Sequence, residues 1–147
     1  MTVRATVIIV IRRPETHMPQ RISIDVPGLD HVNPVPSASR LGPLLITSGV
    51  SGRDPSTGKF PETIEAQCAN MFASLRLMLE LAGAKPDDAI RISVWLKDLS
   101  HRPQLNHEWL VMFPDAASRP ALHTLPNPLL DPPMLIQCDC LAVLGAG

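Results

Sequence analysis

The sequence predicts an α+β fold in which two helices pack on one face of a mixed β-sheet. Three observations support this prediction. The 147 residues are enough for one domain with its own core. The 16 prolines, about twice the usual share of ~5%, divide the chain into proline-free windows that are candidate elements. Strand and helix periods then alternate among these windows, as in a layered α+β domain.

The N-terminal half contains two predicted strands and a turn. Every second residue of 21–26 is isoleucine or valine, which is the two-residue period of a strand. Residues 44–49 read Leu-Leu-Ile-Thr-Ser-Gly, a strand that runs into a glycine turn. A further turn is predicted at 54–58, and the pattern leaves room for one more strand before the first helix.

Residues 62–85 have a clear helical period. Apolar side chains recur three and four residues apart on one stripe, and charged side chains lie off it. Gly83 stands where a glycine commonly ends a helix, and Pro86 prevents the helix from resuming. The predicted buried stripe consists of Ile64, Cys68, Met71, Phe72, Leu75, Met78, Leu79 and Ala82.

The C-terminal half supplies the remaining elements. Residues 90–96 alternate, which predicts a strand with Ile90 on its buried face. Residues 104–113 predict a short second helix, because their apolar side chains fall on one side. Residues 121–125 and 134–143 predict two closing strands.

Composition excludes several functions. The net charge is −1 and the chain has five aromatic residues, so we expect no nucleic-acid partner. Tyrosine is absent, which excludes catalysis by a tyrosine. The chain has no phosphate-binding loop, dinucleotide fingerprint or Gly-x-Ser-x-Gly motif. No cofactor is therefore implied.

The cysteines and the N-terminus bear on location. The chain has three cysteines, Cys68, Cys138 and Cys140, which are too few for a disulfide framework. They have no partners at metal-ligand spacing, so we expect no metal site. We therefore expect the three thiols to be buried and reduced, in a cytoplasmic protein. The apolar run 5–11 is too short to span a membrane. We interpret residues 1–17 as an N-terminal extension, which can be disordered, and 18–147 as a single domain.

Three polar residues are candidates for chemistry. Arg119 precedes a proline that holds it extended, which suits bidentate capture of a carboxylate, although a surface arginine is the alternative. Asp139 stands in an apolar strand, where a carboxylate can position water or move protons, or else form a salt bridge at an edge or between subunits. His123 is either a proton carrier or, as is more common in a strand, a structural residue.

The order and spacing of these segments resemble the Rid (YjgF) family, formerly called the L-PSP endoribonuclease family. The resemblance covers residues 35–143. It rests on many short motifs, each weak alone: Leu44 to Gly49, Thr57-Gly58, Glu65-Ala66-Gln67, Ala82-Gly83-Ala84, Asp88, Ile90 to Leu99, Asn106, Ser118-Arg119 and Ile136 to Asp139.

The resemblance implies a chorismate-mutase-like α+β fold and a homotrimer. In such trimers the sheets form a central barrel, the helices pack outside, and active sites lie between subunits. The implied reaction is hydrolysis of a small 2-imino or enamine carboxylate to a 2-oxo acid and ammonia, without metal or organic cofactor. The expected partner is a small carboxylate-bearing metabolite, with no membrane involved.

The resemblance also implies roles for individual residues, at positions of this sequence that match site residues of the family. Arg119 matches the arginine that binds the substrate carboxylate, and Asp139 matches the position of a glutamate that holds the attacking water. Ser48 and Gly49 match the strand end that lines the pocket, and Asn106 matches a pocket asparagine.

Departures from the family pattern indicate a divergent subgroup. Residues 33–36 replace a segment that carries a pocket tyrosine, Val50 replaces a glutamine, and Ala121 replaces a cysteine. His123 is a candidate to replace a lost polar group. Two alternatives to the deaminase remain open: a non-catalytic metabolite-binding trimer, and a ribonuclease, against which the charge and the few aromatics argue.

Overall fold

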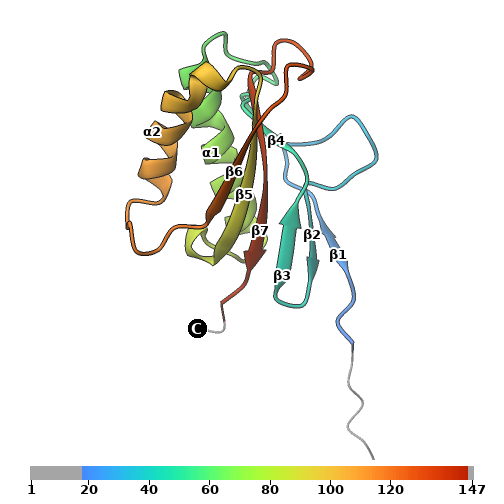
Figure 1. Ribbon diagram of the computed structural model, residues 1–147. Helices are drawn as coiled ribbons and strands as arrows, with labels where there is room; N and C mark the ends of the chain where they lie inside the picture. The colour runs from blue at the N-terminus through green and yellow to red at the C-terminus, as the bar shows by residue number, and fades with distance from the viewer. Residues whose placement is uncertain (1–17, 146–147) are drawn as a thin grey trace, which may run out of the picture.

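The computed structural model describes residues 18–145 and contains a seven-stranded mixed sheet with two helices on one face (Figure 1). The expected extension at 1–17 lies outside these residues. The predicted α+β fold is confirmed. The elements are β1 (Ile22–Ile24), β2 (Ala38–Leu41), β3 (Leu44–Thr47), β4 (Val50–Ser51), α1 (Ile64–Leu81), β5 (Ala89–Leu96), α2 (Arg102–Met112), β6 (Ala121–Pro126) and β7 (Ile136–Val143), with 3-10 turns at Pro86–Asp88 and Leu99–His101.

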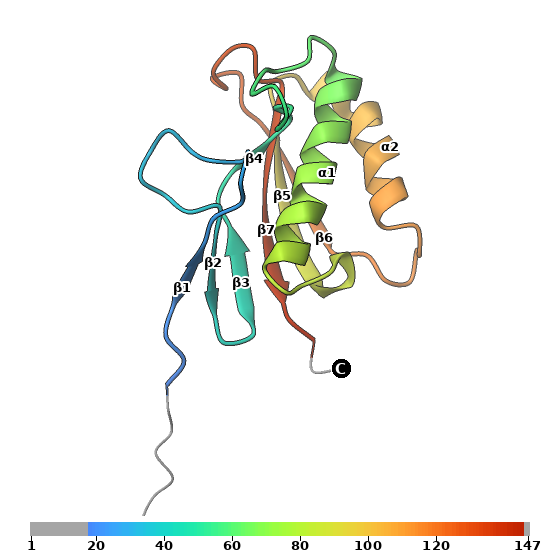
Figure 2. The same cartoon turned by 180° about the vertical axis from the view of Figure 1, so that it is seen from behind.

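The strands follow the order β1-β2-β3-β7-β5-β6, and β4 also pairs with β7. All pairs are antiparallel except β5 and β6, which α2 connects as a crossover helix. Both helices cover the half of the sheet formed by β5, β6 and β7, while β1, β2 and β3 extend beyond them (Figure 2). The sheet therefore has one covered face and one open face.

The core lies between α1 and the covered face of the sheet. All eight residues of the predicted helical stripe are buried. The helix ends as predicted, because Gly83 adopts a φ of 84° and the next residue donates its N–H to the carbonyl of Leu79 at 2.8 Å. The three cysteines are also buried, and burial raises the pKa of Cys68 and of Cys140 to about 12, so both thiols stay protonated.

Two details differ from the predictions. β2 was not predicted, because Ala-Ser-Arg-Leu has no apolar alternation; it forms by pairing with β3 across a turn at Gly42, whose φ is 57°. Ile90 is 49% exposed rather than buried. A bulge between Ala89 and Arg91 shifts the register there, so Ala89 takes the inward position.

Gly52 permits a close approach of the chain after β4 to α1. A Cβ at this position would overlap the main chain of Gln67. Because helix backbone cannot move aside, we expect Gly52→Ala to lower the free energy of unfolding by about 1–3 kcal/mol, the usual cost of overpacking. Urea denaturation measures the change. Another Gly→Ala substitution, Gly58→Ala, cannot serve as a control, because the positive φ of Gly58 would strain an alanine there. The control is Ala69→Gly on α1, which shows how much stability an ordinary helix substitution costs.

No helix within residues 18–145 is both long enough and apolar enough to cross a membrane.

Candidate functional site

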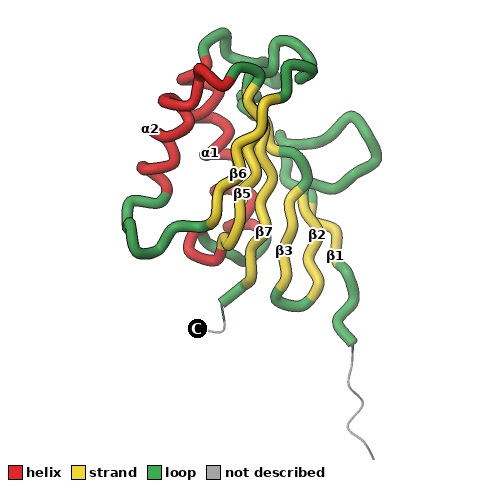
Figure 3. The backbone as a smooth tube through the Cα atoms, in the orientation of Figure 1, coloured by secondary structure: helices red, strands yellow, loops and turns green. Residues whose placement is uncertain are grey.

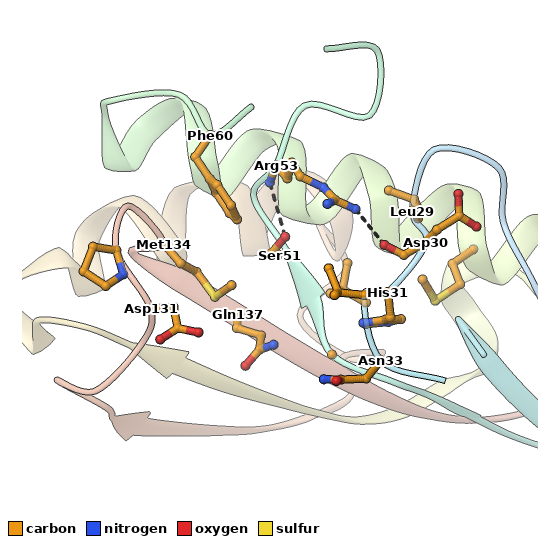
Figure 4. A pocket seen from close by; sticks show the side chains of 15 residues that line it. Leu29, Asp30, His31, Asn33, Ser51, Arg53, Phe60, Asp131, Met134 and Gln137 are labelled. Carbon is orange, nitrogen blue, oxygen red and sulfur yellow. Dashed lines mark hydrogen bonds between the residues drawn. The ribbon is translucent and has the colours of Figure 1, made fainter. Parts of the chain in front are cut away.

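A pocket of about 340 Å³ lies beside β4, and three chain segments that are distant in sequence supply most of its lining. Figure 3 shows the backbone of these segments. These are the chain between β1 and β2, the chain from Gly49 to Arg53, and the chain that leads into β7. Figure 4 shows the side chains. The lining residues are Leu29, Asp30, His31, Val32, Asn33, Gly49, Val50, Ser51, Arg53, Phe60, Met78, Asp131, Pro132, Met134 and Gln137.

The pairing of β4 with β7 builds the floor of this pocket. Val50 pairs with Cys138, and Ser51 pairs with Gln137. This register sets the amide of Gln137 against Gly49, where a Cβ would overlap it. Position 49 of the Ser-Gly motif is therefore a glycine for a steric reason, because any side chain there would displace the amide of Gln137.

Gln67 holds the segment before β7 in place. Its side chain is fully buried. Nε2 donates to the carbonyl of Pro61 at 2.8 Å and to that of Pro133 at 2.9 Å, while Oε1 accepts from the N–H of Leu135 at 2.8 Å. Both amide donors are thus used, and three main-chain groups are satisfied. The residue positions one wall of the pocket without lining it.

Arg53 holds the opposite wall. Its Nη2 donates to the main-chain carbonyl of Asp30 at 2.9 Å. The neighbouring His31 lines the pocket, and its Nε2 is buried without a hydrogen-bond partner in the structure. This wall therefore contains a guanidinium and an imidazole nitrogen.

Gly49 is the one residue of the six predicted for the site that lines this pocket. Ser48 lies just outside, where its hydroxyl donates to the carbonyl of Pro36 at 2.7 Å and its N–H donates to that of Ser37 at 2.8 Å. Ser48 thus anchors the chain before β2 to the end of β3.

Arg119 and Asn106 lie away from the pocket, near α2. Arg119 is exposed, and its Nε donates to the carbonyl of Phe113 at 2.9 Å, at the C-terminal end of the helix. Its Nη2 donates to the carbonyl of Pro114 at 3.3 Å. Asn106 is exposed on α2 and accepts from Arg102 at 2.9 Å. Within one chain, Arg119 therefore binds two main-chain carbonyls just past the C-terminal end of α2.

Asp139 and His123 lie on the open face of the sheet, each paired with Ser93 from opposite sides. Arg119 precedes the first residue of β6 by two positions and is bonded to the carbonyls after α2, so it does not belong to this row. A single chain thus brings Asp139 and His123 to one row and leaves Arg119 apart from both.

Gln137 is a pocket residue that sequence reasoning did not select. It shares the open face with Asp139, since the two are separated by one residue on β7, and its side chain lies in the pocket. The two-residue spacing from Asp139 is visible in the sequence, so it could have identified Gln137 as a candidate site residue. An amide can orient a ligand but does not carry protons near neutral pH, so Gln137 is a binding group rather than a general base.

Among residues 18–145, no group of three or more His, Cys, Asp or Glu side chains is placed to hold a metal ion. The pocket instead combines amides, a hydroxyl, an imidazole, one guanidinium and the carboxyl groups of Asp30 and Asp131. Such side chains bind small molecules through hydrogen bonds and charge.

The fold and the pocket define a small α+β protein with a polar pocket beside the paired strands β4 and β7. A family model described as endoribonuclease L-PSP matches residues 27–144. The chain belongs to this family, the Rid (YjgF) family.

Individual relatives agree with this membership. The chain is 28% identical, over 113 residues, to a 2-iminobutanoate/2-iminopropanoate deaminase of Salmonella typhimurium, covering 76% of this chain and 88% of that protein. It is similar to the YjgF gene product of E. coli, with a TM-score of 0.76 and 25% identity over 83% of this chain and 98% of that one. A Rid-family protein of Yersinia pestis has the same fold, with a TM-score of 0.79 at 20% identity over 85% of this chain and 100% of that one.

Proposed function

We propose that this protein hydrolyses a small 2-imino or enamine carboxylate to a 2-oxo acid and ammonia. The observation that carries the proposal is the pocket that Gly49 and Gln137 help to line, in a chain whose relatives include 2-iminobutanoate/2-iminopropanoate deaminases. Its volume of about 340 Å³ suits a metabolite of a few carbon atoms.

We propose a homotrimer as the active form, with Arg119 reaching the pocket of a neighbouring subunit. Apolar side chains on the open face of the sheet support this arrangement, because Leu41, Leu44, Ile46 and Val143 are each 38–46% exposed there. A contiguous apolar sheet face is usually covered by a partner. The position of Arg119, outside the pocket of its own chain, also supports a site completed across a subunit boundary.

The trimer has a direct test. Light scattering on the purified protein is expected to give a mass about three times the chain mass of 16.0 kDa. Ile46→Asp places a charge on the open face and is expected to yield monomers, since an unpaired charge in an apolar interface is costly. A parent protein that is monomeric at micromolar concentration would remove the basis for a shared site.

The proposed reaction balances with water alone. The oxygen of water bonds to the imine carbon as the nitrogen gains a proton, and the resulting carbinolamine releases ammonia to leave the 2-oxo acid. In this proposal Arg119 holds the substrate carboxylate, and Asp139 orients the water and accepts its proton. Ser48, Gly49, Asn106 and His123 remain proposed contacts around the substrate.

The experiment follows ammonia or oxo-acid release from 2-iminobutanoate or 2-iminopropanoate generated in situ. We expect the parent to accelerate hydrolysis and Arg119→Ala to lower kcat/KM by about 100-fold, as when a substrate loses its orientation. Arg76→Ala is the matched control, because Arg76 is exposed on the outer face of α1. Equal rates for the parent, Arg119→Ala and the buffer blank would overturn the proposal.

A non-catalytic metabolite-binding trimer is the second candidate. It is favoured by the amide of Gln137 in the pocket, because an amide does not accept a proton near neutral pH. Calorimetry that detects tight binding of a 2-oxo acid, together with no turnover of either imine, would support this candidate over the deaminase.

A further inference from the structure

The pocket wall formed by Arg53 and His31 has no assigned role in the proposed reaction. Arg53 lies just after β4, and one of its five N–H donors is used by the carbonyl of Asp30. That bond fixes the guanidinium at the wall. Within residues 18–145 the structure records no further side-chain hydrogen bond and no ion pair for it.

His31 adds a second unused polar group to this wall. Its Nε2 is buried and has no hydrogen-bond partner. A buried polar atom without a partner costs free energy unless a ligand satisfies it. A ligand group that accepts hydrogen bonds would satisfy both this nitrogen, in its N–H tautomer, and the free donors of Arg53.

The carboxylates of the pocket lie away from the wall formed by Arg53 and His31, so this wall is cationic. In Figure 4, Asp131 lies beside Gln137 on the far side of the pocket from Arg53 and His31, and the carboxylate of Asp30 points away from the other labelled side chains. The pocket is therefore divided into an acidic side and a cationic side. An anionic ligand group is attracted to the cationic side, whereas a protonated nitrogen is attracted to Asp131.

We propose that Arg53, with His31, forms a second carboxylate-binding position in this pocket, and that the substrate is an imino acid with two carboxylates. This inference rests on the proposed deaminase function, in which Arg119 holds the carboxylate beside the imine carbon. Arg53 then binds the carboxylate at the other end of the molecule. A guanidinium favours this role because it offers parallel N–H donors to the two oxygens.

The test uses stable 2-oxo acids, so it does not depend on turnover. Calorimetry compares the dicarboxylate 2-oxoglutarate with the monocarboxylate 2-oxobutanoate. We expect the parent to bind the dicarboxylate at least 10-fold more tightly. We expect Arg53→Gln to remove this preference, because it weakens binding of the dicarboxylate, and Arg53→Lys to retain part of it. Arg76→Gln is the matched control and should behave as the parent.

Several results would overturn the inference. They are equal affinity of the parent for the two acids, no binding of either acid, and a preference that survives Arg53→Gln. Thermal denaturation of Arg53→Gln checks that the variant remains folded without the hydrogen bond to Asp30. If this variant is unfolded, the binding preference of Arg53→Lys is measured instead. If the parent shows the preference yet hydrolyses no imine, the binding position stands and the deaminase proposal fails.

Discussion

Replacing Gln67 with alanine is expected to lower the free energy of unfolding by about 3–5 kcal/mol, the largest stability effect we predict. The substitution removes the partner of three main-chain groups, at Pro61, Pro133 and Leu135. It also leaves a cavity, because this side chain, which projects from α1, is fully buried. Urea denaturation followed by circular dichroism measures the change.

Two further variants separate the causes of this effect. Gln67→Leu fills most of the space but makes no hydrogen bond, so it isolates the cost of the unsatisfied main-chain groups. Gln104→Ala is the matched control, since Gln104 lies on α2 and makes one long hydrogen bond of 3.4 Å to Glu65. Parent-like stability in Gln67→Leu would mean that the hydrogen bonds contribute little.

Replacing Asp139 with asparagine is expected to lower kcat for imine hydrolysis by about 10²–10⁴-fold, the usual contribution of a general base. This prediction rests on the proposed deaminase function. The variant keeps the size of the side chain and removes its ability to accept a proton from water. The assay is ammonia release, with KM and kcat determined separately, and only kcat should fall.

Gln137 provides the decisive comparison with Asp139. It lies two residues away on the same face of β7, about 7 Å along the strand. Gln137→Leu is expected to raise KM with a smaller effect on kcat, because an amide orients but does not carry protons. If Asp139→Asn keeps the activity of the parent while Gln137→Leu loses it, water is held by Gln137 and the proposed role of Asp139 is wrong. Asp87→Asn, near the start of β5, is the control for removal of a charge.

Local pattern was sufficient for most elements. The stripe of α1 follows from a helical period within 18 residues, and the end of the helix follows from Gly83 and Pro86. β2 was missed and Ile90 was misplaced because a short strand and a bulge depend on the neighbouring strand, which lies elsewhere in the sequence. The same dependence explains why Gln137 was not selected for the pocket.

By itself, the sequence determined the α+β class, the buried stripe of the long helix and the absence of a tyrosine in any site, because these depend on composition and on periods of a few residues. The tertiary structure alone decided which polar groups meet. It set Gln137 against Gly49, joined Gln67 to a segment 66 residues away, and placed Arg53 and His31 on one wall of the pocket. These contacts depend on how β4 pairs with β7 and how the loops cross the end of the sheet, and no local period of the chain encodes such pairings.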